Sequence, residues 1–347
     1  MSTGYLYEPL PDIASGRRLH LNENTGGCSP AVIRAISRLS RGDLAVYPAY
    51  ARAAERCASA LGVPTDHLLL TNGLDEGIMT VALAMLPRGG DADAVVVEPA
   101  YGMFGPTARL AGARVVQAGP PPDLRFDLDS VRSAITPATR LVFVASPNNP
   151  TGELVPAGAI RQLAAAVPPG GAVFVDEAYA DFEGTTVIGD ISRTPNLIVG
   201  RTFAKAYGLA GVRIGCVVAQ PEIIRRLRGA IAPFSVNVFA AVALEAALAD
   251  RGHVEWYIRQ VRESRQLVYE ACARLGLTCW TSAANFVLVR VGDAPGVRAS
   301  LAARGIHVRD RSGAPGCEGC IRITAGVVDD TNAAIAALEE VLCAGQR

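Results

Sequence analysis

Lys205 is the residue with the clearest chemical potential, because it is the only lysine in a chain of 347 residues that contains 32 arginines. A lysine amine can lose its proton and attack a carbonyl carbon, whereas an arginine guanidinium stays protonated and forms no Schiff base. The simplest alternative is that a compositional preference for arginine left one lysine by chance. The residues around Lys205 decide between these two interpretations.

Lys205 follows an apolar run at residues 197–200 and lies in a segment punctuated by glycines. Polar residues follow two other apolar runs in the same way. Residues 141–145 lead into a loop that contains Asn149, and residues 172–175 lead into Asp176. Ligands of open α/β sheets bind beyond the carboxyl ends of the strands. The sequence therefore predicts a ligand site where these strands end.

Seven apolar runs of strand length lie between residues 68 and 219. Most are rich in Val, Leu and Ile without alternation, which is typical of strands buried on both faces. We expect strands at residues 68–71, 94–98, 114–117, 141–145, 172–175, 197–200 and 215–219, with helices at 75–86, 103–111 and 156–167. Strands that alternate with helices predict an α/β fold with a largely parallel sheet.

The pattern changes near residue 236. Residues 236–275 predict one long amphipathic helix that joins two lobes. The remaining pattern predicts a compact α+β lobe, with strands at 286–290, 306–309 and 320–324 and helices at 295–304 and 331–343.

Composition excludes several classes of partner. The 33 basic residues balance the 33 acidic ones, so no general electrostatic attraction to nucleic acid or to an anionic membrane is expected. No run of 18 apolar residues and no signal-peptide core is present. The eight cysteines follow no disulfide framework, which favours reduced thiols in the cytoplasm. Cys317 and Cys320 form one C-x-x-C without a second pair, so we expect a flexible loop there and no metal site.

The ordered segments resemble the fold-type I pyridoxal-phosphate aminotransferases, and within them the histidinol-phosphate aminotransferase branch. Asn-Asn-Pro-Thr-Gly at 148–152 and Asp-Glu-Ala-Tyr at 176–179 precede Lys205 and Arg213 in the order that the family uses. The resemblance extends from Leu21 to Thr324. It implies a large domain with a mostly parallel seven-stranded sheet and a smaller α+β domain. We place an N-terminal arm at residues 1–30, the large domain at 31–240 and the small C-terminal domain at 241–347.

The resemblance implies pyridoxal 5′-phosphate as cofactor. This cofactor withdraws electrons through a protonated ring nitrogen, and Asp176 matches the carboxylate that holds that proton. Tyr179 and Asn149 match the residues that hydrogen-bond to the phenolic oxygen, and Tyr101 matches the aromatic residue that stacks on the ring. Lys205 matches the lysine that forms the internal aldimine and then acts as the base at the substrate carbon.

The cofactor phosphate is expected at the start of a helix, where free backbone amides and the helix dipole favour an anion. Gly73, Leu74 and Asp75 match that turn, while Thr202 and Arg213 match a hydroxyl and a guanidinium that the family adds.

One further match concerns assembly, and two departures concern the phosphate. Tyr47 matches a tyrosine that the family donates from the partner subunit, which implies a homodimer with shared sites. Leu74 stands where the family has a small residue, and Ala204 stands where it has a serine. Two hydroxyl groups are therefore missing from the phosphate site, which predicts weaker retention of the cofactor.

The substrate end depends on two arginines. Arg322 matches the family residue that clamps an α-carboxylate, or a phosphate in substrates that lack that carboxylate, through its planar fork. Arg309 matches the second anion-binding arginine of the histidinol-phosphate branch, and the alternative for it is a surface salt bridge with Asp310. Asn22 matches a residue that lines the substrate.

The N-terminal segment departs from the family. Thr25 stands where a proline is usual, and no Pro-Tyr pair occurs upstream, with Tyr5 and Tyr7 as the nearest candidates. Because both departures fall at the substrate end, they leave the amino donor open.

The resemblance implies transamination between an amino donor, with L-histidinol phosphate as the first choice, and a 2-oxo acid such as 2-oxoglutarate. Two alternatives stay open within the same scaffold. One is an aminotransferase for an aromatic or specialised-pathway amino acid. The other is a decarboxylase or lyase, because the bond that breaks depends on its orientation to the ring. A third, a binding protein without catalysis, is disfavoured because Lys205, Asp176 and Tyr179 are all present.

Overall fold

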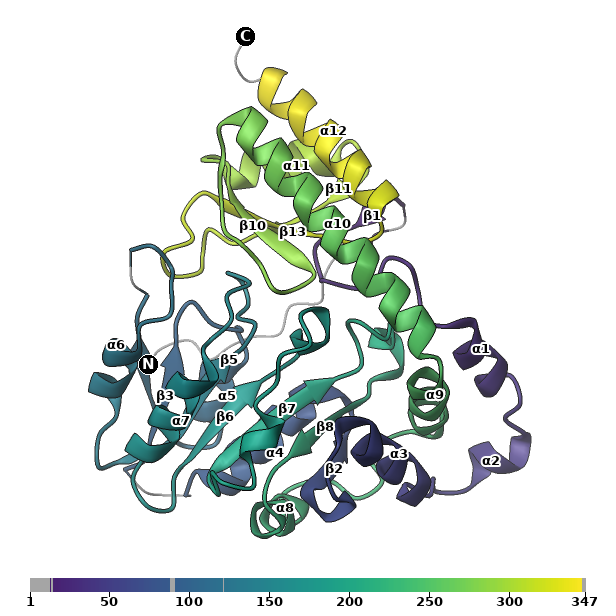
Figure 1. Ribbon diagram of the computed structural model, residues 1–347, viewed down its shortest axis with the longest axis vertical. Coiled ribbons are helices and arrows are strands. Elements are labelled where there is room, and N and C mark those ends of the chain that lie inside the picture. The colour runs from purple at the N-terminus through teal and green to yellow at the C-terminus, as the bar shows by residue number, and fades with distance from the viewer. Residues whose placement is uncertain (1–12, 14, 88–90, 121, 345–347) are drawn as a thin grey trace.

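The computed structural model describes residues 13, 15–87, 91–120 and 122–344 of the chain. Two lobes are visible in Figure 1, a larger one built on a wide twisted sheet and a smaller one that carries the C-terminal helix α12.

The large lobe is built on a seven-stranded sheet with the order β2-β8-β7-β6-β5-β3-β4. Its strands are β2 (Leu68–Thr71), β3 (Asp93–Val97), β4 (Arg114–Ala118), β5 (Thr139–Ala145), β6 (Ala172–Asp176), β7 (Leu197–Thr202) and β8 (Gly215–Val218). All neighbours are parallel except β8, which runs antiparallel to both β7 and β2. The predicted α/β class and each of the seven predicted strands are therefore confirmed.

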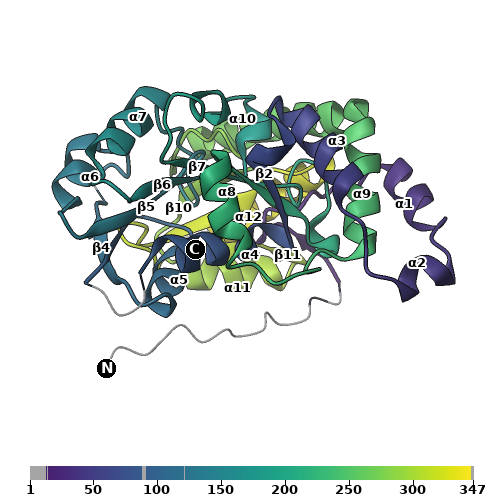
Figure 2. The same ribbon diagram turned by 90° about the horizontal axis from the view of Figure 1, so that it is seen from below.

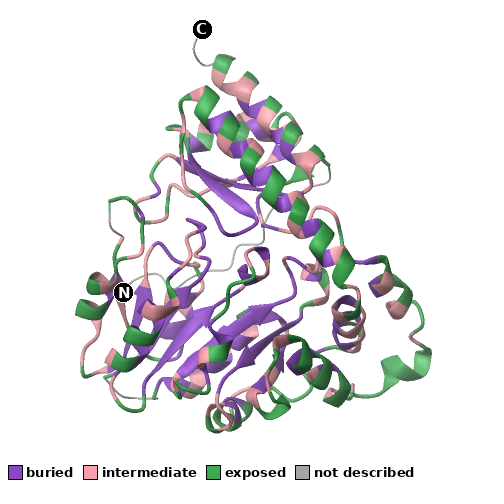
Figure 3. Cartoon of the chain, in the orientation of Figure 1, coloured by how far each residue is buried: buried purple, intermediate pink, exposed green. Residues whose placement is uncertain are grey.

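Helices cover both faces of this sheet, as Figure 2 shows from below. One face packs against α1 (Pro30–Ile36), α3 (Ala51–Leu61), α6 (Leu128–Ala134), α7 (Ala157–Ala166) and α9 (Val238–Ala249). The other face packs against α4 (Gly73–Met85), α5 (Phe104–Leu110) and α8 (Pro221–Arg228). In β5, Val142 and Val144 point to the first face and Phe143 to the second, and all three are fully buried. Burial on both faces explains why these strands do not alternate with polar residues, and Figure 3 shows them as a buried layer.

The smaller lobe combines segments from both ends of the chain. Its four-stranded antiparallel sheet has the order β12-β13-β10-β9, formed by β12 (Arg309–Asp310), β13 (Cys320–Thr324), β10 (Phe286–Arg290) and β9 (Thr278–Cys279). β1 (Arg17–Arg18) pairs in parallel with β11 (Ile306–His307). Helices α10 (Arg251–Leu275), α11 (Ala294–Ala302) and α12 (Val328–Ala344) complete the lobe. The N-terminal strand is thereby held against the C-terminal part of the chain.

The prediction of one helix over residues 236–275 was wrong, because the chain turns at Asp250 between α9 and α10. The Asp250 carboxylate accepts a hydrogen bond from the His253 amide and caps α10, an N-cap role that Asp favours. Since α9 packs against α1 and α3 of the large lobe, the change of lobe follows α9. The division of the chain at residues 30 and 240 stays a prediction.

Some short elements were not predicted correctly from the sequence pattern. The predicted strand at residues 306–309 is split into β11 and β12, and the small helix α2 (Arg41–Ala45) was not expected. Cys317 and Cys320 were expected in a flexible loop, but both are fully buried, against Leu124 and Leu288. All eight cysteines are free. Within the described ranges, no helix is both long and apolar enough to cross a membrane.

Candidate active site

A cavity of about 110 Å³ lies where β5, β6 and β7 end, at the side of the sheet that faces the smaller lobe. Its polar lining residues come from the ends of these three strands and the loops that follow them, from the start of α4, and from Tyr101 after β3 and Arg213 before β8. The full lining is Leu74, Asp75, Ile78, Tyr101, Ala145, Pro147, Asn149, Asp176, Ala178, Tyr179, Thr202, Ala204, Lys205 and Arg213. Nine of the sequence-predicted site residues are thus brought together.

Lys205 reaches this cavity from the loop that follows β7. Its Nζ donates a hydrogen bond of 2.9 Å to the Leu21 carbonyl, which belongs to the N-terminal segment. Burial, and then the charge of Arg322, lower the pKa of Lys205 to about 8. The amine is therefore held in one position and is partly neutral near neutral pH, which a nucleophile or a base requires.

Asp176 ends β6 at the floor of the cavity and is 6 % exposed. Burial raises the pKa of its carboxyl to about 7, although a 2.9 Å hydrogen bond from the Ala178 amide to Oδ1 opposes that rise. No ion pair engages Asp176 within the part of the chain that the structure describes. A buried carboxylate of this kind is stabilised by a cation that enters the cavity.

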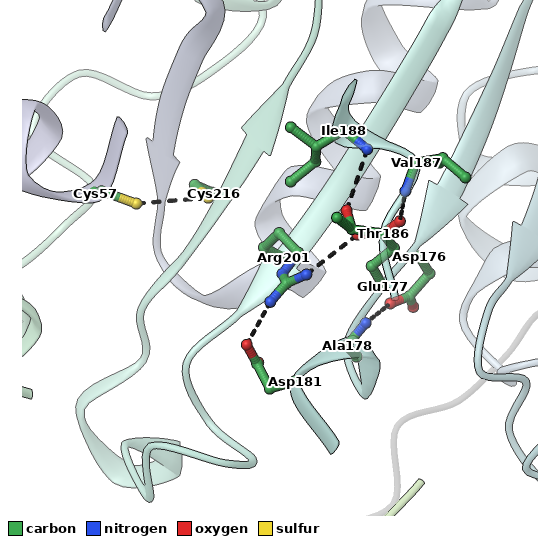
Figure 4. Close-up of polar contacts among 10 residues, drawn as sticks. All are labelled: Cys57, Asp176, Glu177, Ala178, Asp181, Thr186, Val187, Ile188, Arg201 and Cys216. Atoms are coloured by element: carbon green, nitrogen blue, oxygen red, sulfur yellow. Dashed lines mark hydrogen bonds and ion pairs between the residues drawn. The ribbon is translucent and has the colours of Figure 1, made fainter. Parts of the chain in front are cut away.

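The turn after Asp176 is held by a buried set of ion pairs that Figure 4 shows. Arg201 on β7 donates to Glu177 at 3.2 Å and to Asp181 at 2.5 Å. Glu177 also accepts hydrogen bonds from the Thr186 hydroxyl and the Val187 amide. Since Glu177 directly follows Asp176, these contacts set the direction in which the chain leaves β6 toward Tyr179.

Tyr179 links the cavity to the smaller lobe. Its hydroxyl accepts a 2.9 Å hydrogen bond from Asn22 Nδ2. Asn22 has a positive φ of 55°, and its backbone amide donates to the Thr324 hydroxyl on β13. Arg322, also on β13, donates from Nη1 to Asn149 Oδ1 at 2.6 Å. Asn22 and Arg322 therefore lie behind Tyr179 and Asn149 rather than in the lining of the cavity itself.

The start of α4 forms the other end of the cavity. Gly73 has a φ of +72°, and a Cβ atom there would lie 2.6 Å from Nη2 of Arg213. Arg213 pairs with Asp75 at 3.1 Å, and Asp75 also accepts a 2.8 Å hydrogen bond from the Tyr101 hydroxyl. The first backbone amides of a helix and a guanidinium at one place favour a bound anion. Thr202 contributes a hydroxyl at the end of β7.

Two predicted residues lie away from this cavity. Tyr47 is 77 % exposed and stacks on Phe234 with ring centroids 4.4 Å apart. Arg309 lies on β12 opposite Arg322, and the ion pairs of the described residues do not include one between Arg309 and Asp310. Tyr5 and Tyr7 lie outside the described residues.

Comparison with known proteins identifies the family. The model of the family "Aminotransferase class I and II" matches residues 16–338 of this chain. The chain belongs to this aminotransferase family. It is 39% identical over 339 residues to histidinol-phosphate aminotransferase 2 of Ralstonia nicotianae, covering 94% of this chain and 88% of that protein. It is 41% identical over 295 residues to histidinol-phosphate aminotransferase 1 of Cupriavidus pinatubonensis, covering 82% of this chain and 77% of that protein.

The fold of this aminotransferase is shared by solved structures. The structure of histidinol-phosphate aminotransferase from Sinorhizobium meliloti in complex with pyridoxal-5′-phosphate superposes with a TM-score of 0.87 at 29% identity. The match covers 95% of this chain and 91% of that chain. The expected fold type, a fold-type I aminotransferase with a mostly parallel seven-stranded sheet, is confirmed.

Pyridoxal phosphate is the cofactor of this aminotransferase, and the residues of the cavity fit it. Asp176 offers a buried carboxylate without a cationic partner for the ring nitrogen, and Lys205 offers a partly neutral amine for the aldehyde. The glycine at position 73 leaves open the space next to Arg213 that a side chain would occupy. As an aminotransferase, the chain takes an amino donor and a 2-oxo acid as substrates.

The sequence analysis missed three contributors to the site. The Leu21 carbonyl acts through its backbone, and Ile78 lines the cavity from α4 with an ordinary apolar side chain. Arg311 on the face of Arg309 and Arg322 was also missed. Its signal was present, because Arg309 and Arg311 alternate in a segment of strand character, which places them on one face.

Proposed function

We propose that this aminotransferase transfers the amino group of L-histidinol phosphate to 2-oxoglutarate. The observation that carries the proposal is the pair Arg309 and Arg322, which are register partners on β12 and β13. Residues directly opposite each other in an antiparallel pair lie on the same face. Two guanidinium groups on one face favour a substrate whose far end is a phosphate. The two relatives at 39% and 41% identity support the choice of donor.

The residues that would hold the cofactor are those of the cavity. Asp176 would bind the proton of the ring nitrogen, and Tyr179 and Asn149 would donate to the phenolic oxygen. Tyr101 would stack on the ring. The amides that begin at Gly73, together with Thr202 and Arg213, would bind the phosphate. Bound in this way, pyridoxal phosphate supplies an electron sink that stabilises negative charge on the substrate carbon next to nitrogen.

Lys205 moves the proton in this proposal. Its amine is partly neutral near neutral pH because burial lowers its pKa to about 8, so it can accept the proton from the substrate carbon. The Leu21 carbonyl, 2.9 Å from Nζ, keeps the amine on one side of the cavity. Proton transfer by a positioned group of this kind contributes a rate factor of about 10²–10⁴.

The test is an absorption spectrum of the holoenzyme before and after excess L-histidinol phosphate, without a 2-oxo acid. Conversion of the bound cofactor to its amino form would establish this donor, and later addition of 2-oxoglutarate should restore the starting spectrum. A spectrum that stays unchanged would rule out this donor. Aromatic amino acids and phosphorylated amino acids would then be the next donors to examine.

We also propose a homodimer in which Tyr47 enters the partner's cavity and contacts the cofactor phosphate. Tyr47 is 77 % exposed, does not line the cavity of its own chain, and lies among exposed apolar residues that include Leu44, Val46 and Phe234. A mixture of Tyr47→Ala and Lys205→Ala proteins should regain activity after subunit exchange, because some dimers then hold one complete site. No regain despite exchange would contradict the sharing of sites.

We also propose a cellular compartment for the enzyme and a division of the chain into domains. Eight free cysteines support a reducing environment, and we place the enzyme in the cytoplasm. We keep the predicted arm at residues 1–30 but place the second boundary at Asp250 instead of residue 240, so that the large domain ends with α9 and the small domain begins with α10. Limited proteolysis should cut near Asp250 if this division is correct.

A further inference from the structure

One face of the smaller lobe gathers buried nitrogen atoms that have no hydrogen-bond partner. Of seven such buried side-chain atoms in the described residues, three are nitrogens of His20, Arg311 and Arg322. Buried polar groups are nearly always hydrogen-bonded, so an unpartnered nitrogen indicates a missing partner. Three such nitrogens in the smaller lobe therefore indicate that polar partners are missing there.

The register of the strands places the arginines on this face. Arg309 is opposite Arg322, and the Arg311 amide donates to the Cys320 carbonyl, which continues the same pairing. Because side chains alternate along a strand, Arg309 and Arg311 both lie on the side of Arg322. Ile321 lies on the other side, in the core of the smaller lobe.

His20 joins this face from the N-terminal segment. Its neighbour Leu19 is buried in the core of the smaller lobe, and His20 is itself buried but lies outside that core. The His20 ring lies 6.4 Å from the ring of His307, and the His20 carbonyl accepts a 2.8 Å hydrogen bond from Arg322 Nη2. Burial lowers the pKa of His20 to about 4, so its ring is neutral near neutral pH and can donate one hydrogen bond without adding charge.

The arginines on this face, Arg309, Arg311 and Arg322, form no ion pairs within the described residues. The nearby Glu98 uses its two oxygens to accept from the Ala100 amide and the Gln117 side chain. Burial, first of all, lowers the pKa of Arg311 and the pKa of Arg322. An anion from outside would therefore stabilise these three guanidinium groups, none of which has an ion-paired carboxylate in the described residues.

Arg311 also has space beside it. It lines a second cavity of about 330 Å³, together with Arg109 and Glu98, and this cavity shares Tyr101 with the first one. Tyr101 is thus a common wall of the two cavities, and Arg311 lies beside open space on the side of the second one.

We propose that Arg311 and His20 are specificity-determining residues that, with Arg309 and Arg322, select an amino donor whose far end is a phosphate monoester dianion. This inference rests on the proposed function, because it concerns the same site. A carboxylate carries one charge on two oxygens, whereas a phosphate monoester carries close to two charges on three oxygens. The third guanidinium, of Arg311, and the neutral hydrogen-bond donor, His20, match the extra charge and the extra oxygen of the phosphate. They would therefore favour a phosphorylated amino substrate over a carboxylated amino acceptor that uses the same site.

The first experiment replaces Arg311 by Gln in the holoenzyme. The KM for L-histidinol phosphate should rise roughly 10–100-fold, as expected when a charged hydrogen bond is lost, while the KM for 2-oxoglutarate changes less than about threefold. Arg311→Lys keeps the charge and should recover part of the loss. Arg298→Gln is the matched control, because Arg298 is exposed on α11 of the same lobe.

His20 can be tested separately, because its carbonyl contact with Arg322 does not depend on its side chain. His20→Ala should raise the KM for the donor about fivefold or more, and His20→Asn, which keeps a side-chain donor, should raise it less. Equal effects on both substrates, or a fall in kcat alone for Arg311→Gln and His20→Ala, would indicate a structural role and overturn the inference.

Inorganic phosphate separates this inference from the proposed function. With the cofactor bound, phosphate should inhibit the wild-type enzyme competitively against the amino donor, and Arg311→Gln should weaken that inhibition about tenfold or more. A further outcome is that L-histidinol phosphate does not react with the wild-type enzyme while Arg311→Gln still weakens phosphate binding. In that case the proposed amino donor is wrong, but the inferred anion site is supported. Unchanged phosphate inhibition and unchanged KM in a variant with a normal cofactor spectrum would overturn the inference.

Discussion

The two ends of the active site differ in whether their arginines form ion pairs with carboxylates. At the cofactor end, the Arg213 guanidinium and the Tyr101 hydroxyl both meet the carboxylate of Asp75. At the substrate end, no carboxylate in the described residues forms an ion pair with Arg309, Arg311 or Arg322. Arg213 is 44% exposed in its side chain, whereas Arg322 is 5 % exposed.

This difference indicates which end depends more on its ligand. A partly exposed ion pair gains little because water screens it, and it is also easily exchanged for a bound phosphate. A buried guanidinium without a counter-charge is costly, so it gains more from a ligand that neutralises it. We therefore expect cofactor binding to tolerate the loss of one contact, and substrate recognition to depend strongly on each arginine.

The largest effect should come from the residue between the two ends. Lys205→Ala and Lys205→Arg should abolish the covalent cofactor spectrum and lower kcat by at least about 10²–10⁴-fold, because neither side chain offers a free amine. Absorption spectra and steady-state rates measure both changes. A covalent spectrum that survives in either variant would contradict the central role of this amine.

Arg322→Lys tests the substrate end directly. Lys keeps a charge but lacks the planar fork that contacts Asn149 and the His20 carbonyl. We expect KM for the amino donor to rise roughly 10–100-fold while the bound cofactor stays, since a hydrogen bond to a charged group contributes about 1.5–3 kcal/mol. Titration of the variant with donor, followed by its spectrum, gives both quantities. Wild-type kinetics in this variant would remove the role assigned to Arg322.

Gly73→Ala tests the cofactor end. The left-handed backbone at position 73 costs a non-glycine residue about 1–2 kcal/mol, and the added Cβ would displace the flexible end of Arg213. We expect the dissociation constant of the cofactor to rise roughly tenfold. Gly112→Ala is a matched control, because Gly112 also has a positive φ and nothing lies near its Cβ position. If the two variants retain the cofactor equally well, the contact with Arg213 is unimportant.

The smallest effect should be the pH dependence of cofactor attachment to the apoprotein. Only the neutral amine attacks the aldehyde, and burial lowers the pKa of Lys205 from 10.5 to about 8. The neutral fraction should therefore rise about fivefold between pH 7 and pH 8 and become nearly constant above pH 9. Stopped-flow absorption measures this rate. A rate that keeps increasing tenfold per pH unit up to pH 10 would indicate an unperturbed lysine.

The lowered pKa of Lys205 also affects how folding stability depends on pH, with a sign opposite to that of an ion-paired lysine. Because the folded pKa of Lys205 lies below its unfolded value, the folded apoprotein binds fewer protons between about pH 8 and 10.5. Its stability relative to the unfolded chain should therefore increase as the pH rises through that window. Urea unfolding of the apoprotein at pH 8 and pH 10 measures the difference, and Lys205→Ala should remove it.

The sequence predicted the large sheet well for a physical reason. Strands such as β5 and β6 are buried on both faces, so their apolar runs are continuous and have no other good explanation. It predicted the end of the long C-terminal helices less well. The sequence did contain a local signal there, because Asp250 interrupts the apolar pattern and is a favoured N-cap residue, but the prediction of one helix passed over it.

The chemistry of the cofactor end could be predicted from the sequence alone, because Lys205, Asp176, Tyr179 and Gly73 each follow a strand or begin a helix at a recognisable position. The sequence also named residues at the substrate end, but their contacts became visible only in the folded molecule. Arg322 meets Asn149 across 173 residues, and Asn22 meets Tyr179 across 157 residues, through contacts between two lobes. Local patterns carry no information about such pairs, because which side chains meet depends on strand register and on how the lobes pack.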